Sequence, residues 1–272
     1  MNLYNVINEI EKVDPEVYDR LDGRRAALKN FTGFAGKVAV AAVPFMLGSM
    51  FKKAYGQTGG TNADIVAILN FALTLEYLES EFYKRGVSSA PIPAADLAGF
   101  QTIRDHEIAH VADLRSTITA LGGTPVTLTA ASFDFTGHGA FPTVFTDYNV
   151  FLAVSNAFED TGVRAYKGQA TGLMSNNDVL TAALQIHSVE ARHAAHIRRL
   201  RATAAGIKPW ITSNNAGGLP TAIYAGEENT AQVGISIVNI NSTGISANAA
   251  SEAFDEPLTK DQVMAIVQPF LA

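Results

Sequence analysis

The 272-residue sequence contains no cysteine. This absence excludes disulfide bonds, thiolate metal sites and cysteine nucleophiles, so a metal site in this chain has to use nitrogen and oxygen ligands. Basic residues are also few, with 20 lysines and arginines against 26 aspartates and glutamates and a net charge of −6. The sequence has no concentrated basic face, and nucleic acid is therefore not an expected partner.

Long apolar runs are missing as well. The apolar stretch Val38–Phe51 has 14 residues and contains Pro44. A helix that spans a membrane needs about 20 predominantly apolar residues. We therefore expect no stable membrane span in the mature protein.

The same apolar stretch belongs to a pattern near the N-terminus. Arg24 and Arg25 precede it, and a small-x-small pattern ending at Gly56 follows it. This combination resembles a twin-arginine export signal with cleavage near Gly56, which predicts a periplasmic or exported protein. The alternative is that residues 1–56 form a retained N-terminal helical segment, in which case a cytoplasmic location is expected.

Four later stretches repeat apolar residues at intervals of three and four, which is typical of amphipathic helices. The first is expected to end at Gly86, the third to begin at Pro142, and the fourth to start at one of residues 176–178 and end at Gly206. The expected helices cover about 63–85, 94–121, 142–171 and 178–206. The chain between the second and third helices, residues 122–141, shows no helical period.

A connection of that length inside a compact domain needs a reason, and a long crossover provides one. The sequence therefore predicts an all-α fold, a ferritin-like four-helix bundle over residues 61–206 with one long crossover between helices 2 and 3. Residues 207–272 are rich in glycine and asparagine and are expected to form an irregular C-terminal wrap. Within them we expect a short strand at Val233–Ile240 and a helix at Lys260–Leu271.

The pattern Glu-x-x-His occurs at Glu107–His110 and again at Glu190–His193. On a helix, residues three apart lie on one face, so both side chains can reach a single cation. Glu76 precedes Glu107 by 31 positions, and Glu159 precedes Glu190 by the same 31. The two halves are offset by 83 residues and together indicate one site with approximate two-fold symmetry.

The repeat also chooses between two acidic residues of the first helix. Sliding the sequence by 83 places Glu76 on Glu159 but Glu79 on Gly162. Glu79 is therefore expected to be exposed, or to lie beside the ligands without being one of them. The predicted metal ligands are Glu76, Glu107, His110, Glu159, Glu190 and His193.

Four carboxylates and two imidazoles suit two divalent cations, because the metal charge of +4 balances four buried carboxylates. One glutamate from each of two helices and Glu-x-x-His from each of the other two is the arrangement of dinuclear carboxylate bundles. The expected cofactor is a pair of iron ions, with manganese as the alternative. Two carboxylates can bridge the metals, which leaves open positions for O₂ or H₂O₂.

Several further residues lie near the predicted ligands along the helices. Tyr83 and Tyr166 follow the ligand glutamates of their helices by seven positions, and either core packing or a proton or redox relay explains them. Asp113 and His196 are repeat partners that could orient the ligand imidazoles. His106 points about 100° away from Glu107 around its helix, which predicts a surface or interhelical position.

Three segments and a tail motif carry a resemblance to a known family. Ile68–Glu79, Asp105–His110 and Ser188–His193, with the tail motif Ala253–Thr259, resemble the ferritin-like proteins grouped with plant and bacterial desiccation-related proteins. The similarity covers residues 62–206 and, more loosely, the tail. It implies a ferritin-like bundle with a dinuclear iron site and a stress-related role.

Two functions from different classes follow. The first is a dinuclear iron or manganese protein that reacts with O₂ or H₂O₂, as a ferroxidase, an oxidase or a peroxide-removing enzyme similar to manganese catalase. The alternative is an exported structural, stress or surface-assembly protein with a vestigial metal site. A homo-oligomer is compatible with both, whereas a mineral-storing cage has the least support because the tail shows no sign of closed assembly.

Overall fold

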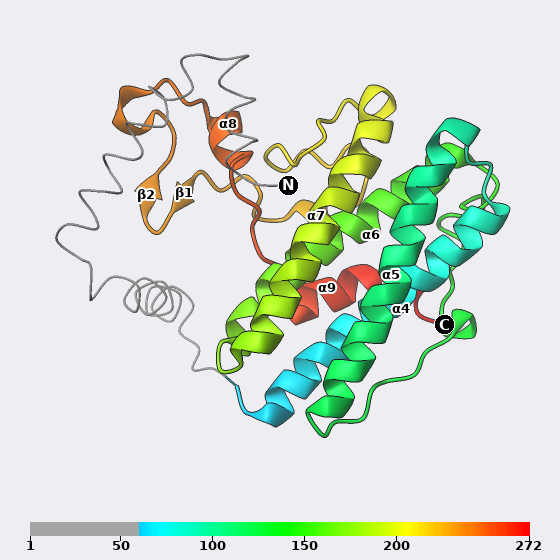
Figure 1. Ribbon diagram of the computed structural model, residues 1–272. Coiled ribbons are helices and arrows are strands. Elements are labelled where there is room, and N and C mark those ends of the chain that lie inside the picture. The colour runs from blue at the N-terminus through cyan, green and yellow to red at the C-terminus, as the bar shows by residue number, and fades with distance from the viewer. Residues whose placement is uncertain (1–59) are drawn as a thin grey trace, which may run out of the picture. The chain divides into compact units, whose positions relative to one another are not determined.

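Four long helices dominate the part of the chain that the computed structural model describes, residues 60–272. They are α4 (Asn62–Ser89), α5 (Ala94–Ala120), α6 (Tyr148–Gln169) and α7 (Asn177–Ala205), and they lie side by side (Figure 1). Helix α4 pairs with α5, and α6 pairs with α7. The predicted all-α bundle with a long crossover between its second and third helices is confirmed. The segment that resembles an export signal lies outside the described residues.

The helix ends follow local capping rules. Thr61 and Asp64 form a capping box at the start of α4, and the Asn176 side chain accepts a hydrogen bond from the backbone of Val179 at the start of α7. Gly206 ends α7 in the left-handed conformation, with φ of 63°. The predicted start and end of the fourth helix are confirmed.

Two predicted helix ends are wrong. Helix α4 continues past Gly86 to Ser89, and Gly86 is small because the Phe151 ring fills the space where a Cβ would lie. The third helix begins at Tyr148 rather than at Pro142, since the Asp147 side chain accepts hydrogen bonds from two backbone N–H groups of the first turn. In both places a tertiary or capping contact overrides the local glycine or proline signal.

The crossover between α5 and α6 is held by aromatic side chains. It contains one 3₁₀ turn, η1 (Ala130–Ser132), and buries Phe133, Phe135 and Phe145. The rings of Phe135 and Phe145 lie 5.7 Å and 5.5 Å from the ring of Phe82 in α4, measured between centroids. Burial of these rings against the bundle compensates for the lack of helical hydrogen bonds.

The chain after Gly206 is irregular, as predicted. Its short elements are η3 (Thr221–Tyr224), β1 (Ala231–Gln232), β2 (Ile235–Ser236), η4 (Ile240–Ser242), α8 (Ala247–Ser251), α9 (Lys260–Val267) and η5 (Gln268–Phe270); η2 (Ala170–Leu173) directly follows α6. The strands are antiparallel and two residues long. Of the predicted strand Val233–Ile240 only Ile235–Ser236 forms a strand, because Val233 and Gly234 have positive φ and form the turn of this hairpin.

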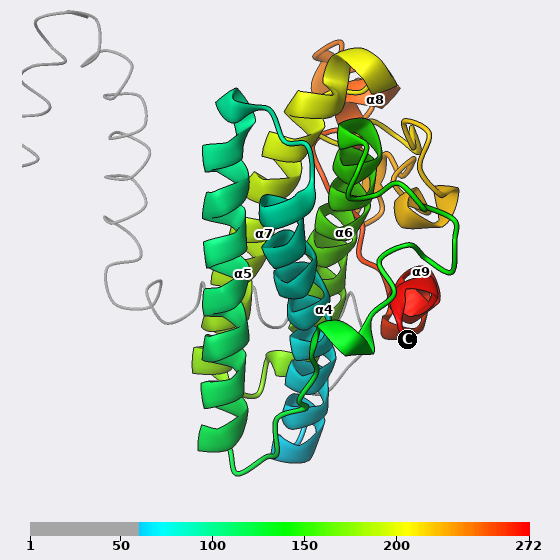
Figure 2. The same ribbon diagram turned by 90° about the vertical axis from the view of Figure 1, so that its right-hand side faces the viewer.

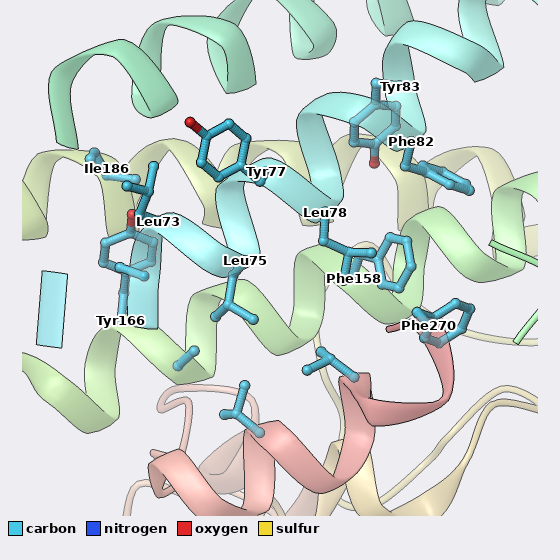
Figure 3. Close-up of a cluster of buried hydrophobic side chains, with 14 of the residues drawn as sticks. Leu73, Leu75, Tyr77, Leu78, Phe82, Tyr83, Phe158, Tyr166, Ile186 and Phe270 are labelled. Atoms are coloured by element: carbon cyan, nitrogen blue, oxygen red, sulfur yellow. The ribbon is translucent and has the colours of Figure 1, made fainter. Parts of the chain in front are cut away.

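The last part of the chain completes the core of the bundle. Figure 2 shows α9 end-on at the outside of the bundle, where it contacts α6. Val263, Val267 and Phe270 are buried, and the Phe270 ring lies 4.8 Å from the ring of Phe158 in α6 (Figure 3). The tail is thus part of the folded unit. Among the described residues, no helix is long and apolar enough to cross a membrane.

A buried arginine joins α6 to the tail. The guanidinium of Arg164, fully buried, lies 2.8 Å from the Glu227 carboxylate and donates to the carbonyl oxygens of Ile223, Ala225 and Glu256. A second buried pair, Arg198 and Asp160, has a distance of 2.7 Å; Arg198 also donates to two tail carbonyls. These contacts fix the tail through charge and hydrogen bonds as well as apolar packing.

Gly168 allows the closest approach between α6 and the tail. A Cβ at this position would overlap the carbonyl oxygen of Leu258, whose N–H donates to the carbonyl of Arg164 at 3.2 Å. We expect Gly168→Ala to destabilise the protein by about 1–3 kcal/mol, because the tail backbone has to move. Urea unfolding measures this. Alanine is otherwise the better helix former by about 1 kcal/mol, so a stabilised variant would contradict the close contact.

Candidate metal centre

The six predicted ligands converge inside the bundle. Each of the four helices contributes, and every one of the six side chains is buried, with at most 8% of a residue exposed. The residues are Glu76 of α4, Glu107 and His110 of α5, Glu159 of α6, and Glu190 and His193 of α7. The structure thus brings together the whole predicted set, and its role in binding metal stays a prediction.

The six residues form two overlapping groups. Glu76, Glu107, His110 and Glu190 make up one, and Glu107, Glu159, Glu190 and His193 the other. Within each group, one oxygen or nitrogen atom from every residue lies within 4.8 Å of the others. Glu107 and Glu190 belong to both groups. This is the arrangement that two bridging carboxylates between two cations require.

Each histidine turns its Nδ1 atom toward the carboxylates. Nδ1 of His110 lies 3.1 Å from Glu76 and 3.3 Å from both Glu107 and Glu190. Nδ1 of His193 lies 3.0 Å from Glu107 and 3.3 Å from Glu159. The two halves therefore repeat one geometry, as the 83-residue offset predicts.

Several atoms at this centre are buried without a hydrogen bond. They are Oε1 of Glu107, Oε2 of Glu159, both carboxylate oxygens of Glu190 and Nδ1 of His193. The close approach of His193 to its carboxylates thus lacks hydrogen-bond geometry. Buried polar atoms without partners are costly and uncommon in native proteins. Converging lone pairs of this kind fit a cation, and the donor set of oxygen and imidazole nitrogen fits iron or manganese.

Comparison with known protein families decides the relationship. The sequence model of the ferritin-like domain matches residues 64–203, just over half of the chain, and this range contains all six residues. The chain belongs to the ferritin-like domain family. A search of curated proteins finds no match. The resemblance inferred from the sequence is confirmed at the level of this family, and the link to desiccation stays a prediction.

Two tyrosines in the ferritin-like bundle hold the outer glutamates, Glu76 and Glu159, each of which belongs to only one of the two groups. The hydroxyl of Tyr83 donates to Oε1 of Glu159 at 2.5 Å, and the hydroxyl of Tyr166 donates to Oε1 of Glu76. Both rings also pack in the core (Figure 3). Burial, and then the charge of the adjacent glutamate, raise the pKa of both tyrosines well above the usual 10. Both hydroxyls are therefore protonated donors that orient the carboxylates.

Unlike the two tyrosines, Asp113 and His196 form no hydrogen bond with a predicted ligand among the described residues. Asp113 is exposed, and no contact joins it to a ligand imidazole among the described residues. His196 packs against Gly99 and the ring of Phe100, and its Nε2 is buried without a hydrogen bond. The orienting role predicted for these two residues therefore finds no contact that supports it.

The imidazole beside His193 belongs to His106 instead. Nδ1 of His106 lies 2.9 Å from Nε2 of His193, and the two rings stack with their centroids 5.2 Å apart. His106 is exposed at the interhelical position that the sequence predicts, but its contact with a candidate ligand was not foreseen. A usable signal was its position one turn before His110, on nearly the same helix face.

Of the two positions expected for Glu79, exposed or beside the ligands, the structure shows the second. Glu79 is 3% exposed, and no hydrogen bond or ion pair to its carboxylate is present among the described residues. Burial, and then the charges of Glu190 and Glu159, raise its pKa well above 4.5. The centre thus contains five buried carboxylates where the repeat predicts four.

Mutual repulsion and burial set the protonation of the metal-free centre. Burial, followed by the charges of other glutamates, raises the pKa of Glu107 well above its usual value and that of Glu190 to about 8. Burial opposes the charged form of His110, but the carboxylates of Glu107, Glu190 and Glu76, all within 3.3 Å of its Nδ1, raise its pKa to about 12. Glu76 is buried too, yet its bond with His110 holds its pKa below 4.5. The metal-free centre therefore retains protons that a bound metal would displace.

We expect the stability of metal-free protein to fall between pH 7 and pH 9. Glu190 and His110 have folded-state pKa values of about 8 and 12, above the values of 4.5 and 6.5 for the unfolded chain. The stability that these two groups contribute is fully present below their unfolded-state pKa values. It is lost as the pH rises toward and through their folded-state pKa values. Each additional proton held by the native state contributes a slope of about 1.4 kcal/mol per pH unit.

Urea unfolding at pH 7, 8 and 9 in the presence of chelator measures this slope. Three histidines, His106, His187 and His196, have a lowered pKa. Their effect on stability changes with pH only below pH 7, so they do not affect the slope between pH 7 and pH 9. Metal-loaded protein is the control, because its ligands have already lost their protons. A metal-free stability that stays level or increases over this range would contradict the protonation described here.

Proposed function

We propose that this ferritin-like protein binds two iron ions, with manganese as the alternative, and reacts with O₂ or H₂O₂. One observation carries the proposal: two buried four-residue groups share Glu107 and Glu190, and their unpaired oxygen and nitrogen atoms converge. Each position combines one imidazole nitrogen, one outer carboxylate and two shared carboxylates. Iron and manganese both accept this donor set, and availability decides between them.

The residues have distinct roles in such a centre. Glu107 and Glu190 belong to both positions and would help to hold and neutralise both ions, while Tyr166 and Tyr83 hold the other two carboxylates, those of Glu76 and Glu159. His110 and His193 would hold the metals as neutral imidazoles, so His110 would give up its proton on metal binding. A bound metal pair would supply the electrons that reduce O₂ or H₂O₂. Complete burial of the four glutamates keeps bulk water away from the centre.

The test combines metal content with turnover. Protein purified without chelator, or reloaded anaerobically, is expected to hold about two equivalents of iron or manganese. Iron-loaded protein should consume O₂ or H₂O₂ with added Fe²⁺, and manganese-loaded protein should decompose H₂O₂. Asp113→Asn is the matched control, because Asp113 is exposed on the helix that carries Glu107.

The opposite result is equally clear. Less than about a tenth of an equivalent of metal, with an unchanged melting temperature on metal addition, would favour the structural protein with a vestigial site. Two bound equivalents without reaction toward either oxidant would contradict the redox part of the proposal and leave the metal centre standing.

Export is proposed separately, from the sequence alone. Arg24 and Arg25 with the following apolar stretch support a periplasmic or exported location and, with it, a stress-related role outside the cytoplasm. Replacing both arginines with lysine is expected to retain the protein in the cytoplasm, as measured by cell fractionation. Unchanged fractionation would contradict a twin-arginine signal.

A further inference from the structure

The candidate centre departs from two-fold symmetry at one pair of positions. The 83-residue offset matches all six predicted ligands, but it places Glu79 of α4 on Gly162 of α6. One half of the centre therefore has an additional carboxylate where the other half has no side chain. The structure shows what occupies the space that the glycine leaves.

Gly162 makes room for two carboxylates at once. It lies one helical turn after Glu159, and a Cβ at this position would be 3.2 Å from Oε2 of Glu190 and 3.3 Å from Oε1 of Glu79. These distances are shorter than side chains ordinarily tolerate. Both oxygens therefore border the same small space, and the Glu79 carboxylate points toward a shared candidate ligand rather than toward solvent.

Nothing in the described chain compensates the Glu79 carboxylate. The side chain is 97% buried, and no hydrogen bond or ion pair reaches it from the described residues. A carboxylate buried beside other carboxylates is costly, and a cation is a partner that this cluster of acids can share. The charges that act most strongly on Glu79 are those of Glu190 and then Glu159. Oε1 of Glu79 borders the space left by Gly162, one turn after Glu159 on α6, so Glu79 lies toward the position formed with His193, although its own helix contributes Glu76 to the other position.

We propose that Glu79 is a fifth carboxylate ligand, which makes the metal position beside Glu159 and His193 different from the position beside Glu76 and His110. The inference rests on the proposed metal centre. Five carboxylates carry a charge of −5, so two divalent ions leave −1, whereas one trivalent and one divalent ion leave zero. The position beside His193 is accordingly expected to bind divalent metal more tightly and to favour the trivalent ion.

Anaerobic titration with Mn²⁺, followed by calorimetry and electron paramagnetic resonance, tests this inference without any turnover. Wild-type protein is expected to bind two Mn²⁺ ions with unequal affinities. Glu79→Gln keeps the shape of the side chain and removes one buried charge. It should weaken the tighter of the two Mn²⁺-binding steps about ten- to a hundredfold and change the weaker step little. Glu81→Gln is the matched control, because Glu81 lies two residues along α4 and pairs with Lys84 at 2.7 Å.

Two variants that each remove one histidine assign the effect to one position. In a His110→Ala background the metal left beside His193 should be weakened by Glu79→Gln; in a His193→Ala background the metal left beside His110 should not. If wild-type protein binds two ions and Glu79→Gln binds both with the same affinities as wild type, this inference is overturned and the metal centre stands. Wild-type protein that binds no Mn²⁺ or iron would overturn both.

Discussion

Replacing both Glu107 and Glu190 with glutamine is expected to abolish binding of both metal ions. Each of these residues belongs to both four-residue groups, so the double variant removes two of the four candidate ligands at each position. Metal content measured by mass spectrometry should fall from about two equivalents to less than a tenth. No other pair among the six predicted ligands affects both positions in this way.

The double variant should nevertheless fold. Glutamine keeps the size of the side chain and removes charges whose repulsion and burial oppose folding of the metal-free protein. Its melting temperature in chelator is expected to equal or exceed that of the parent, while the increase on metal addition disappears. Asp113→Asn should keep both metals. Two tightly held ions in the double variant would show that the centre lies elsewhere.

Arg164→Met is expected to cost about 3–5 kcal/mol of stability, the effect of breaking a fully buried ion pair. The change leaves Glu227 buried without its cation and removes the hydrogen bonds to the tail carbonyls. Burial already raises the pKa of Glu227 to about 7 despite the arginine. Urea unfolding of metal-free protein measures the loss, and limited proteolysis should cut the released tail first.

Two controls separate the ion pair from a general loss of packing. Adding Glu227→Leu to Arg164→Met should restore much of the stability, because no buried charge is then left alone. Arg104→Met removes an exposed pair with Asp105 and should cost less than about 1 kcal/mol. A cost for Arg164→Met as small as that for Arg104→Met would show that the tail does not depend on this contact.

Much of the bundle could be predicted because its signals are local. Apolar spacing defines the four helices, and the Asn176 and Gly206 caps define the ends of α7. The six candidate ligands could be selected because the same spacing occurs twice. Two copies of Glu-x-x-His with the same preceding glutamate are much less expected by coincidence than one. The beginning of α6 could not be predicted, since Pro142 is a good first-turn residue and only the capping hydrogen bonds of Asp147 favour the later start.

What escaped prediction depends on neighbouring helices. A helical period gives the face of a residue on its own helix but not which side chain of another helix lies opposite. His106 lies away from the face of Glu107 yet stacks on His193 of α7. The repeat gives Glu79 no partner and so argues against it as a ligand, whereas the space left by Gly162 of α6 accommodates it beside Glu190.

Anomalous X-ray scattering from crystals grown without chelator, recorded at the iron and manganese absorption edges, tests the metal centre most directly. The account predicts two peaks, one next to Nδ1 of His110 and the other next to Nδ1 of His193. Carboxylates of Glu107 and Glu190 should contact both. Crystals grown with added metal that show no peak among these residues, or show peaks only elsewhere in the protein, would contradict it.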